Sequence, residues 1–397
     1  MQNYKKICDL LSSEECKGFI NKFLHLNPAQ IALQYRDKLP CDASTLALVV
    51  QLYQKGQQKL PAWVQNYCAL TAKSFEQSTS QTVALYKTTF MQGSKLLVLG
   101  GGFGVDEWAL TNTFNQITSI DNDAELNQIV AFNAKRLGID NCERLTLTAE
   151  DYLENTATFF DCIYTDPDRR DGQGARKITL QHSTPDIIGL LPTLWRHTKK
   201  LIIKASPVID IINTAKQLEG VSEVRVIALE NEVKEVLFTV EKGFTGAYNT
   251  IATNYTNHKW QEIAHKGETL KPAHNNEEDS FFYEPNLSII KAGLHQHYAA
   301  QMGLGLLDEK TAYYTSTNNV NDFLGRVFCI KAVLPFSKKG IATYLKQHKI
   351  SKANIAKRNF RLSVDELKKM FTIKDGGSEY LFFTQLQGKP FLYHCTK

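Results

Sequence analysis

The sequence predicts an α/β protein whose central domain is a parallel sheet wound with helices. Short apolar runs that suit strands alternate with helical patterns between residues 93 and 206. A glycine-rich turn, GGGFG at residues 100–104, follows the first of these runs, and Asp121 ends the second. Sheets of this kind bind their ligands at the carboxyl ends of the strands, where both features are expected to lie.

The expected elements follow one another at short intervals. Strands are predicted at residues 95–100, 117–121, 145–151, 161–166 and 200–206, and helices at 106–114, 124–138 and 184–198. Two further alternating runs within 221–240 are expected to close the sheet, with a β-hairpin as one option. Right-handed crossovers join the parallel strands, so their carboxyl ends share one edge.

The length of 397 residues is enough for several domains. Residues 1–80 are predicted to form a helical N-terminal region, because apolar residues recur there at spacings of three and four. Residues 81–242 hold the alternating strands and helices. Residues 243–330 are assigned to a small α+β linking domain, for which a ferredoxin-like fold is one option. Residues 331–397 mix both patterns and are assigned to a second α+β module.

The composition is that of a soluble globular protein, with 43% hydrophobic and 22% charged residues. No run of about 18 apolar residues and no secretory signal is present, so a cytoplasmic protein with no membrane partner is expected. The eight cysteines are scattered and form no C-x-x-C pair. The pair His295 and His297 lacks a third ligand, so no metal is expected.

The spacing of the glycines distinguishes between two kinds of cofactor site. A dinucleotide site needs G-x-G-x-x-G, yet Val105 takes the last position counted from Gly100, and Glu107 takes it counted from Gly102. The frame that fits is G-x-G-x-G, at Gly100, Gly102 and Gly104. That spacing is typical of S-adenosylmethionine sites, and an ordinary glycine turn is the alternative.

Acidic residues at the next strand ends are the expected partners of such a cofactor. Asp121 lies 21 residues after Gly100, and its carboxylate is expected to accept hydrogen bonds from the ribose hydroxyls. Asp123 is better placed to cap the following helix. Glu150 or Asp151 is expected to accept a hydrogen bond from the adenine amino group. The choice between them stays open because the strand register is unknown, and solvent exposure is the alternative for both.

The fourth predicted strand runs into DPDRR at residues 166–170. Proline cannot donate to a sheet ladder, so the strand should end there, with Asp166 and Pro167 at the reaction centre. Arg169 and Arg170 have three interpretations. They could contact nucleic-acid phosphates, form ion pairs with neighbouring aspartates or, least favoured, take part in catalysis.

Together these features resemble the class I S-adenosylmethionine-dependent methyltransferases, and more narrowly the bacterial methyltransferases with a THUMP-like C-terminal domain. The segments that carry the resemblance are FEQSTSQTVALYK (75–87), GGFGVD (101–106), DPDRR (166–170), KASPVIDI (204–211), NEVKEVLF (231–238), YEPNLSIIKAG (283–293), NIAKRNFRL (354–362) and DGG (375–377). The resemblance implies a Rossmann-like sheet, methyltransferase activity and S-adenosylmethionine as the methyl donor.

Two features depart from the pattern of such enzymes. Val98 stands two residues before the first glycine, where many class I enzymes carry an acid that helps to bind the cofactor. Asp168 and Arg169 replace the second proline and the aromatic residue of the (N/D)-P-P-(Y/F/W) motif, whose aromatic stacks a flipped base. Methylation of an exocyclic amino group by that geometry is therefore not supported.

A basic segment near the C-terminus suggests the substrate class. Residues 331–361 hold no Asp or Glu and nine basic residues: Lys331, Lys338, Lys339, Lys346, Lys349, Lys352, Lys357, Arg358 and Arg361. With Phe336, Tyr344 and Phe360 between them, they could neutralise phosphates and stack bases. The alternative is a solvated helix face whose aromatic residues belong to the core. The resemblance to an RNA-binding THUMP module favours RNA, with Lys357 and Arg358 among the contacts.

The sequence is compatible with several functions. The first is methylation of tRNA or rRNA. The second is binding of S-adenosylmethionine, RNA or both without chemistry, and the third is methylation of a protein or small molecule. A nicotinamide dehydrogenase fits least, because of the glycine spacing. The sequence does not indicate the base, the atom methylated or the oligomeric state.

Overall fold

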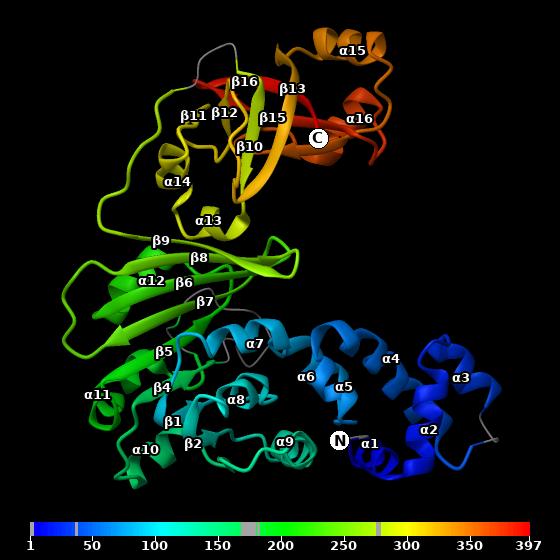
Figure 1. The fold of residues 1–397 in the computed structure, drawn as a ribbon, viewed down its shortest axis with the longest axis vertical. Coiled ribbons are helices and arrows are strands. Elements are labelled where there is room, and N and C mark those ends of the chain that lie inside the picture. The colour runs from blue at the N-terminus through cyan, green and yellow to red at the C-terminus, as the bar shows by residue number, and fades with distance from the viewer. Residues whose placement is uncertain (1–3, 36–38, 168–179, 181–182, 275–278) are drawn as a thin grey trace. The chain divides into compact units, whose positions relative to one another are not determined.

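The computed structural model describes residues 4–35, 39–167, 180, 183–274 and 279–397 (Figure 1). The chain divides into two compact units. Unit 1 comprises Met1–Ser222 and Leu237–Gly246, and unit 2 comprises Glu223–Val236 and Ala247–Lys397. None of the helices in the described part of the chain is both long and apolar enough to cross a membrane.

The N-terminal region of unit 1 is helical, as predicted. Its helices are α1 (Tyr4–Ser12), α2 (Glu14–Phe23), α3 (Pro28–Gln34), α4 (Ala43–Lys59), α5 (Pro61–Gln65), α6 (Ala72–Gln77) and α7 (Gln81–Lys87). Polar side chains such as Asp42 and Ser80 cap their first turns by accepting backbone N–H bonds. The buried core of this region includes Trp63 and continues into Phe103 and Ile129, so the helices share one core with the domain that follows.

The first sheet contains nine strands in the order β3-β2-β1-β4-β5-β7-β6-β8-β9. The strands are β1 (Gly93–Leu99), β2 (Phe114–Ile120), β3 (Cys142–Leu145), β4 (Cys162–Thr165), β5 (Lys200–Ala205), β6 (Val221–Leu229), β7 (Glu232–Glu241), β8 (Asn249–Thr256) and β9 (Lys259–Lys266). The connecting helices are α8 (Val105–Leu110), α9 (Ala124–Leu137), α10 (Ala149–Asn155), α11 (Ile187–His197) and α12 (Ile211–Leu218). The two closing strands predicted within 221–240 are β6 and β7.

The strand order creates a switch point in unit 1. β1 pairs in parallel with both β2 and β4, and Leu99 lies level with Ile120 on one side and Thr165 on the other. The chain winds outward from β1 to β3 and then returns to β4, so the direction of winding reverses between β1 and β4. Ligands of doubly wound sheets bind at such a point, beyond the carboxyl ends of the strands.

The predicted third strand, 145–151, is wrong in its position. β3 ends at Leu145, and Ala149–Asn155 forms helix α10. The hydroxyl of Thr148 accepts the Asp151 N–H at 3.1 Å and caps this helix. A threonine followed three residues later by an acid is a helix-start signal, which the alternating pattern LTLTAED concealed. The predicted helix 106–114 is also too long, because α8 ends at Leu110.

Unit 2 contains a second sheet in the order β11-β12-β10-β13-β16-β15-β14. Its strands are β10 (Phe281–Pro285), β11 (Gly305–Leu306), β12 (Tyr314–Ser316), β13 (Gly325–Pro335), β14 (Asn354–Lys357), β15 (Glu379–Leu386) and β16 (Lys389–Thr396). Its helices are α13 (Leu287–Lys291), α14 (His295–Gln301), α15 (Lys338–Gln347) and α16 (Val364–Phe371). β13 pairs with β10 on one side and β16 on the other, so the sheet continues through the predicted boundary at 330.

Candidate functional site

The glycine turn lies at the carboxyl end of β1, and its backbone requires glycine. Gly100, Gly102 and Gly104 have φ angles of +75°, +56° and +79°. Residues with side chains rarely adopt these conformations, whereas glycine adopts them without a steric cost. The N–H of Gly100 donates to the carbonyl of Ile120 at 2.9 Å, which ties the turn to the end of β2. The G-x-G-x-G spacing therefore reflects the path of the backbone.

Gly101 needs to be glycine for a different reason. A Cβ at this position would overlap Glu107 Oε1 and Ser119 Oγ and lie 2.9 Å from Arg144 Nη1. The glutamate is buried and accepts from Arg144 at 2.9 Å and from the hydroxyl of Ser119. Burial raises the pKa of Glu107, and Arg144 and Ser119 oppose that rise only in part. A buried ionic cluster thus occupies the space that a side chain would need.

Arg144 holds the turn in place and was not predicted. It lies in β3, and its Nη2 donates to the carbonyl of Gly102 at 2.6 Å, while its Nε donates to Asn127 Oδ1 at 2.6 Å. With Nη1 bound to Glu107, the guanidinium fork contacts the glycine turn, α8 and α9 together. The partners lie far from Arg144 in the sequence, so no local pattern marked it.

Asp121 lies beside the glycine turn, immediately after the end of β2. Its Oδ2 accepts the N–H of Gly102 at 2.9 Å, and its Oδ1 accepts the N–H of Asp123 at 3.0 Å. A carboxylate has about four acceptor sites, so Asp121 has capacity for further hydrogen bonds. Asp123 caps α9 by accepting the N–H of Leu126 at 3.0 Å, as the sequence predicts.

Glu150 and Asp151 lie in the first turn of α10 and not at a strand end, so that expectation is wrong. Both side chains are exposed, and Asp151 accepts from the hydroxyl of Thr148 at 2.7 Å. Acidic residues are favoured in the first turn of a helix, where the helix dipole is positive. A contact of either residue with adenine stays a prediction.

Four charged side chains form a continuous chain at the ends of β1, β4 and β5. Lys204 Nζ lies 2.7 Å from Asp166 Oδ2 and 3.5 Å from Asp106 Oδ2. Lys87 Nζ lies 2.7 Å from the other oxygen of Asp106. We call the series Asp166–Lys204–Asp106–Lys87 the charge chain. The exposed fraction of the side chains falls along it, from 39% at Asp166 to 14%, 11% and 0%.

Two hydroxyl groups complete the environment of Asp106. Tyr164, in β4, donates to Asp106 Oδ2 at 2.8 Å and accepts from Lys87 at 3.0 Å. Thr79 donates to the same oxygen at 3.1 Å and accepts from Lys204 at 2.9 Å. Burial by itself would raise the pKa of Asp106, but the charges of Lys87 and Lys204 and the hydrogen bonds from Lys87 and Tyr164 outweigh it and hold the pKa below its usual range.

Most of the charge chain was not predicted as a site. Lys87 and Lys204 lie within sequence segments that carry the family resemblance, but no role followed for them from the sequence alone. A fully buried lysine is rare and needs a charged partner. That partner, Asp106, is 19 residues from Lys87 and follows the glycine turn. A solvent-facing lysine at the end of a helix would look the same in the sequence.

Asp166 follows β4, as the sequence predicts. Its N–H donates to the carbonyl of Leu99 at 3.3 Å, and its own carbonyl oxygen lies 3.1 Å from the position of a Cβ on Gly100. The glycine turn and the backbone of Asp166 therefore approach closely across the switch point. Pro167 is buried. Arg169 and Arg170 lie outside the residues that the structure describes.

In unit 2, Lys357 and Arg358 have different surroundings. Lys357 is exposed, and its ammonium donates to the carbonyl of Phe360 at 3.0 Å. Arg358 Nη2 lies 3.1 Å from Glu284, a buried acid that also binds Arg326. The Arg358 guanidinium thus joins β10 to the segment after β14. Any RNA contact by either residue stays a prediction.

The aromatic residues of the basic segment are partly buried and pack against a core cluster, which favours the alternative interpretation. Phe336 and Phe360 pack edge to face with ring centroids 5.0 Å apart, within the cluster beneath α15 and α16. The hydroxyl of Tyr344 is 2.8 Å from His394 Nδ1. These contacts leave only part of each ring exposed. The basic side chains themselves are exposed, except for the partly buried Arg358.

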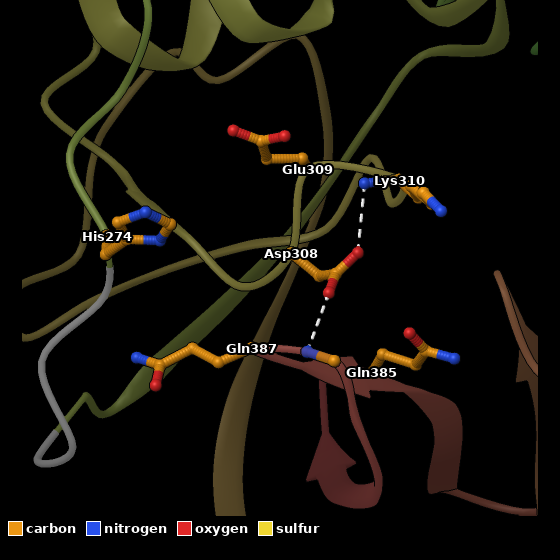
Figure 2. A pocket seen from close by; sticks show the side chains of 7 residues that line it. His274, Asp308, Glu309, Lys310, Gln385 and Gln387 are labelled. Atoms are coloured by element: carbon orange, nitrogen blue, oxygen red, sulfur yellow. Dashed lines mark hydrogen bonds between the residues drawn. The ribbon is translucent and has the colours of Figure 1, made fainter.

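Unit 2 also has an open cavity of about 610 Å³, shown in Figure 2. Its lining residues are His274, Asp308, Glu309, Lys310, Gln385, Gln387 and Gly388. Asp308 accepts the backbone N–H groups of Lys310 at 3.0 Å and Gly388 at 2.9 Å, so its carboxylate stabilises two turns. Nowhere in the described ranges do three His, Cys, Asp or Glu side chains gather in a way that could hold a metal ion.

Comparisons with known families match the C-terminal part of the chain. Residues 325–397 match a THUMP domain-like family, and residues 281–323 match a ferredoxin-like domain. No curated protein matches the sequence.

Comparison with solved structures gives a match over the whole chain. A crystal structure of a putative methyltransferase from Porphyromonas gingivalis W83 superimposes with a TM-score of 0.83 and 27% identity, covering 100% of this chain and 99% of that one. The likeness to SMU.776, a putative methyltransferase complexed with SAH, has a TM-score of 0.33 and 12% identity, covering 40% of this chain and 48% of that one. A precorrin-6y C5,15-methyltransferase from Geobacter metallireducens GS-15 gives 0.28 and 14%, covering 47% and 82%.

The two weaker likenesses span less than half of this chain. The first extends over the helical region, the parallel sheet and the C-terminal module alike. The chain therefore has the class I methyltransferase fold, with a helical N-terminal region and a C-terminal THUMP-like domain.

Proposed function

We propose that this protein transfers methyl groups from S-adenosylmethionine to RNA. The main support for this proposal is that three features of the chain lie together at the switch point. The positive-φ glycine turn, the Asp121 carboxylate and the Asp166–Pro167 pair lie at the ends of β1, β2 and β4. This is where sheets of this type bind a nucleotide-containing ligand.

The residues present fit such a cofactor. Among the residues that the structure describes, and apart from the two chain neighbours of Gly102, no atom lies within 4 Å of the position where a Cβ on Gly102 would be, which leaves room for a ligand beside the turn. Backbone without side chains permits the close approach that an amino acid group requires. Asp121 borders the turn and has acceptor capacity for the two ribose hydroxyls.

When bound, S-adenosylmethionine supplies an electrophilic methyl group on a sulfonium, and the C–S bond breaks as the substrate's nucleophile forms its new bond to carbon. The protein contributes mainly by holding the reactants in line. Asp166 lies at the end of β4, next to the glycine turn. It would orient the nucleophile or accept the proton that the nucleophile loses.

RNA is the substrate class that the C-terminal module supports. Residues 325–397 match a THUMP domain-like family. The exposed basic residues are Lys331, Lys338, Lys339, Lys346, Lys349, Lys352, Lys357 and Arg361. Such a surface can neutralise phosphates, with few constraints on sequence.

The activity is tested by transfer of a labelled methyl group to rRNA and tRNA taken from a strain that lacks the protein. Incorporation into one RNA species is expected. Incorporation into protein alone would contradict the RNA substrate.

Binding without chemistry is the second candidate, and Val98 favours it. This side chain is buried in β1, where many class I enzymes carry an acid for the cofactor. RNA binding with no S-adenosylmethionine binding in calorimetry would support this candidate, and micromolar binding of S-adenosylmethionine would weaken it.

Replacement of Asp121 by asparagine should weaken S-adenosylmethionine binding by roughly 10- to 100-fold in calorimetry, because charge-assisted hydrogen bonds to ribose become neutral ones. Asp123→Asn is the matched control. It alters only the α9 cap and should leave the affinity within a few-fold. Equal S-adenosylmethionine affinities in the two variants would show that Asp121 does not bind the cofactor.

Charge reversal of Lys338 and Lys339 together should make the salt dependence of RNA binding shallower. Both are exposed in the first turn of α15. For single-stranded RNA, the log–log slope should fall by up to about 1.4 for two lost phosphate contacts. Arg358→Gln provides the comparison. An unchanged slope with lower stability would assign Arg358 to its ion pair with Glu284, and a shallower slope would assign it to RNA.

A further inference from the structure

We propose that Lys204 is a positioning residue that sets the Asp166 carboxylate for the substrate's nucleophile. This inference rests on the proposed methyltransferase function. Within the described part of the chain, the contacts of Lys204 include Asp166, Thr79 and Asp106, and these three residues lie outside the glycine turn. Its role would therefore belong to the substrate end of the site and not to cofactor binding.

The strand register brings the two side chains together. β4 and β5 are parallel neighbours, with Thr165 level with Ile203. Asp166 and Lys204 are the next residues on the two strands, so their side chains leave the sheet on the same face. Their charged atoms, Oδ2 and Nζ, are 2.7 Å apart. The pairing is thus fixed by backbone geometry at the sheet edge.

The other residues of the charge chain hold the Lys204 side chain in one orientation. A lysine side chain is long and flexible, and an exposed ion pair rarely holds it in one place. Here the Lys204 ammonium also donates to Thr79 at 2.9 Å and lies 3.5 Å from Asp106. Asp106 is itself held by buried Lys87 and Tyr164. The lysine is therefore anchored from the interior, and Asp166 is the exposed end.

The two oxygens of Asp166 have different environments. Oδ2 accepts from Lys204, whereas Oδ1 has no hydrogen-bond partner among the residues described. An N–H or O–H of a substrate could donate to Oδ1 without displacing the lysine. Lys204 would then restrict the rotation of the carboxylate and hold Oδ1 toward the reacting atom, as a supporting residue does in a preorganised site.

The cost of this arrangement argues against a purely structural role. Each buried charge carries a desolvation penalty, and hydrophobic residues of similar volume often stabilise a fold equally well or better. The charge chain includes two lysines and two aspartates at the edge where the ligand is expected. Active sites are places where charged side chains are arranged close together out of water, so the position of the charge chain at this edge favours a functional role.

The test compares Lys204→Met and Lys204→Arg with the unchanged protein in full-length form, using RNA from a strain that lacks the protein as substrate. In Lys204→Met, kcat should fall by roughly 10- to 100-fold, while KM for the RNA and the affinity for S-adenosylmethionine stay within about three-fold. Lys204→Arg should recover most of the rate. Lys216→Met, at an exposed position on α12, should match the unchanged protein.

A double-mutant cycle separates positioning from a general structural effect. If Lys204 acts through Asp166, then Lys204→Met should slow the reaction no further once Asp166 is asparagine. Additive losses would overturn the inference, as would a Lys204→Met variant that retains full kcat or loses cofactor affinity. If the unchanged protein binds S-adenosylmethionine but methylates no RNA, the proposed function fails and the inference fails with it.

Discussion

Replacement of Gly101 by alanine should lower the free energy of unfolding by about 3–5 kcal/mol, the range for breaking a buried ion pair. The new methyl group would overlap Glu107 Oε1 and Ser119 Oγ. Glutamate tips can usually move aside, but this one is buried and bound by Arg144 at 2.9 Å. Urea denaturation measures the loss, and calorimetry should show S-adenosylmethionine affinity reduced by at least about 10-fold, because Arg144 also holds Gly102.

Gly102→Ala is the matched control for this prediction. Its φ of +56° makes alanine unfavourable by about 1–2 kcal/mol, but no atom of the described residues beyond its chain neighbours lies within 4 Å of the new Cβ. It should therefore be the more stable of the two variants. If Gly101→Ala proves as stable as Gly102→Ala, the side chains around Glu107 can shift to make room for the methyl group at little cost in stability.

Replacement of Lys87 by methionine should also cost about 3–5 kcal/mol of unfolding free energy at neutral pH. The change leaves Asp106 buried, with Lys204 at 3.5 Å as its remaining cation among the contacts described. Chemical denaturation measures the loss. Lys95→Met, at an exposed position of β1, should change stability by no more than about 0.5 kcal/mol. Equal stability of the two variants would show that the buried pair contributes nothing.

The same pair should make stability depend on pH. Because the pKa of Asp106 is held below its usual range in the folded state, its contribution is present above the unfolded value, about 4. The contribution is lost as the pH falls below that value toward the folded pKa. In Asp106→Asn this part is absent, so stability should fall less steeply below pH 4. An unchanged acid slope would assign the pH dependence to other carboxylates.

The sequence predicts the framework of the site because each part of it has a local signal. β1, β2 and β4 are short apolar runs, and each ends in a residue of distinctive chemistry: a glycine turn, Asp121 or Asp166. The parallel order then places these ends at one edge. The predicted capping role of Asp123 is confirmed for a similar reason, since it depends on a helix start three residues away.

What the sequence does not predict depends on contacts between distant residues. Arg144 binds Gly102 across 42 residues, and Lys204 binds Asp166 across 38. These pairs follow from strand register, which no single strand specifies. In the same way, Phe336 and Phe360 lie among basic residues in the sequence, yet they are partly buried and pack against a core cluster. Residue order alone does not show which face of unit 2 they occupy.

The pairing of β13 limits how unit 2 could have been assembled from separable parts. The ferredoxin-like match ends at residue 323 and the THUMP-like match begins at 325, which suggests two interchangeable modules. However, β13 bonds to β10 from the first module and to β16 from the second. A gene rearrangement that separated them would expose unpaired backbone along β10 and β13, which favours aggregation. The two matched regions are therefore expected to have been inherited together, as one unit.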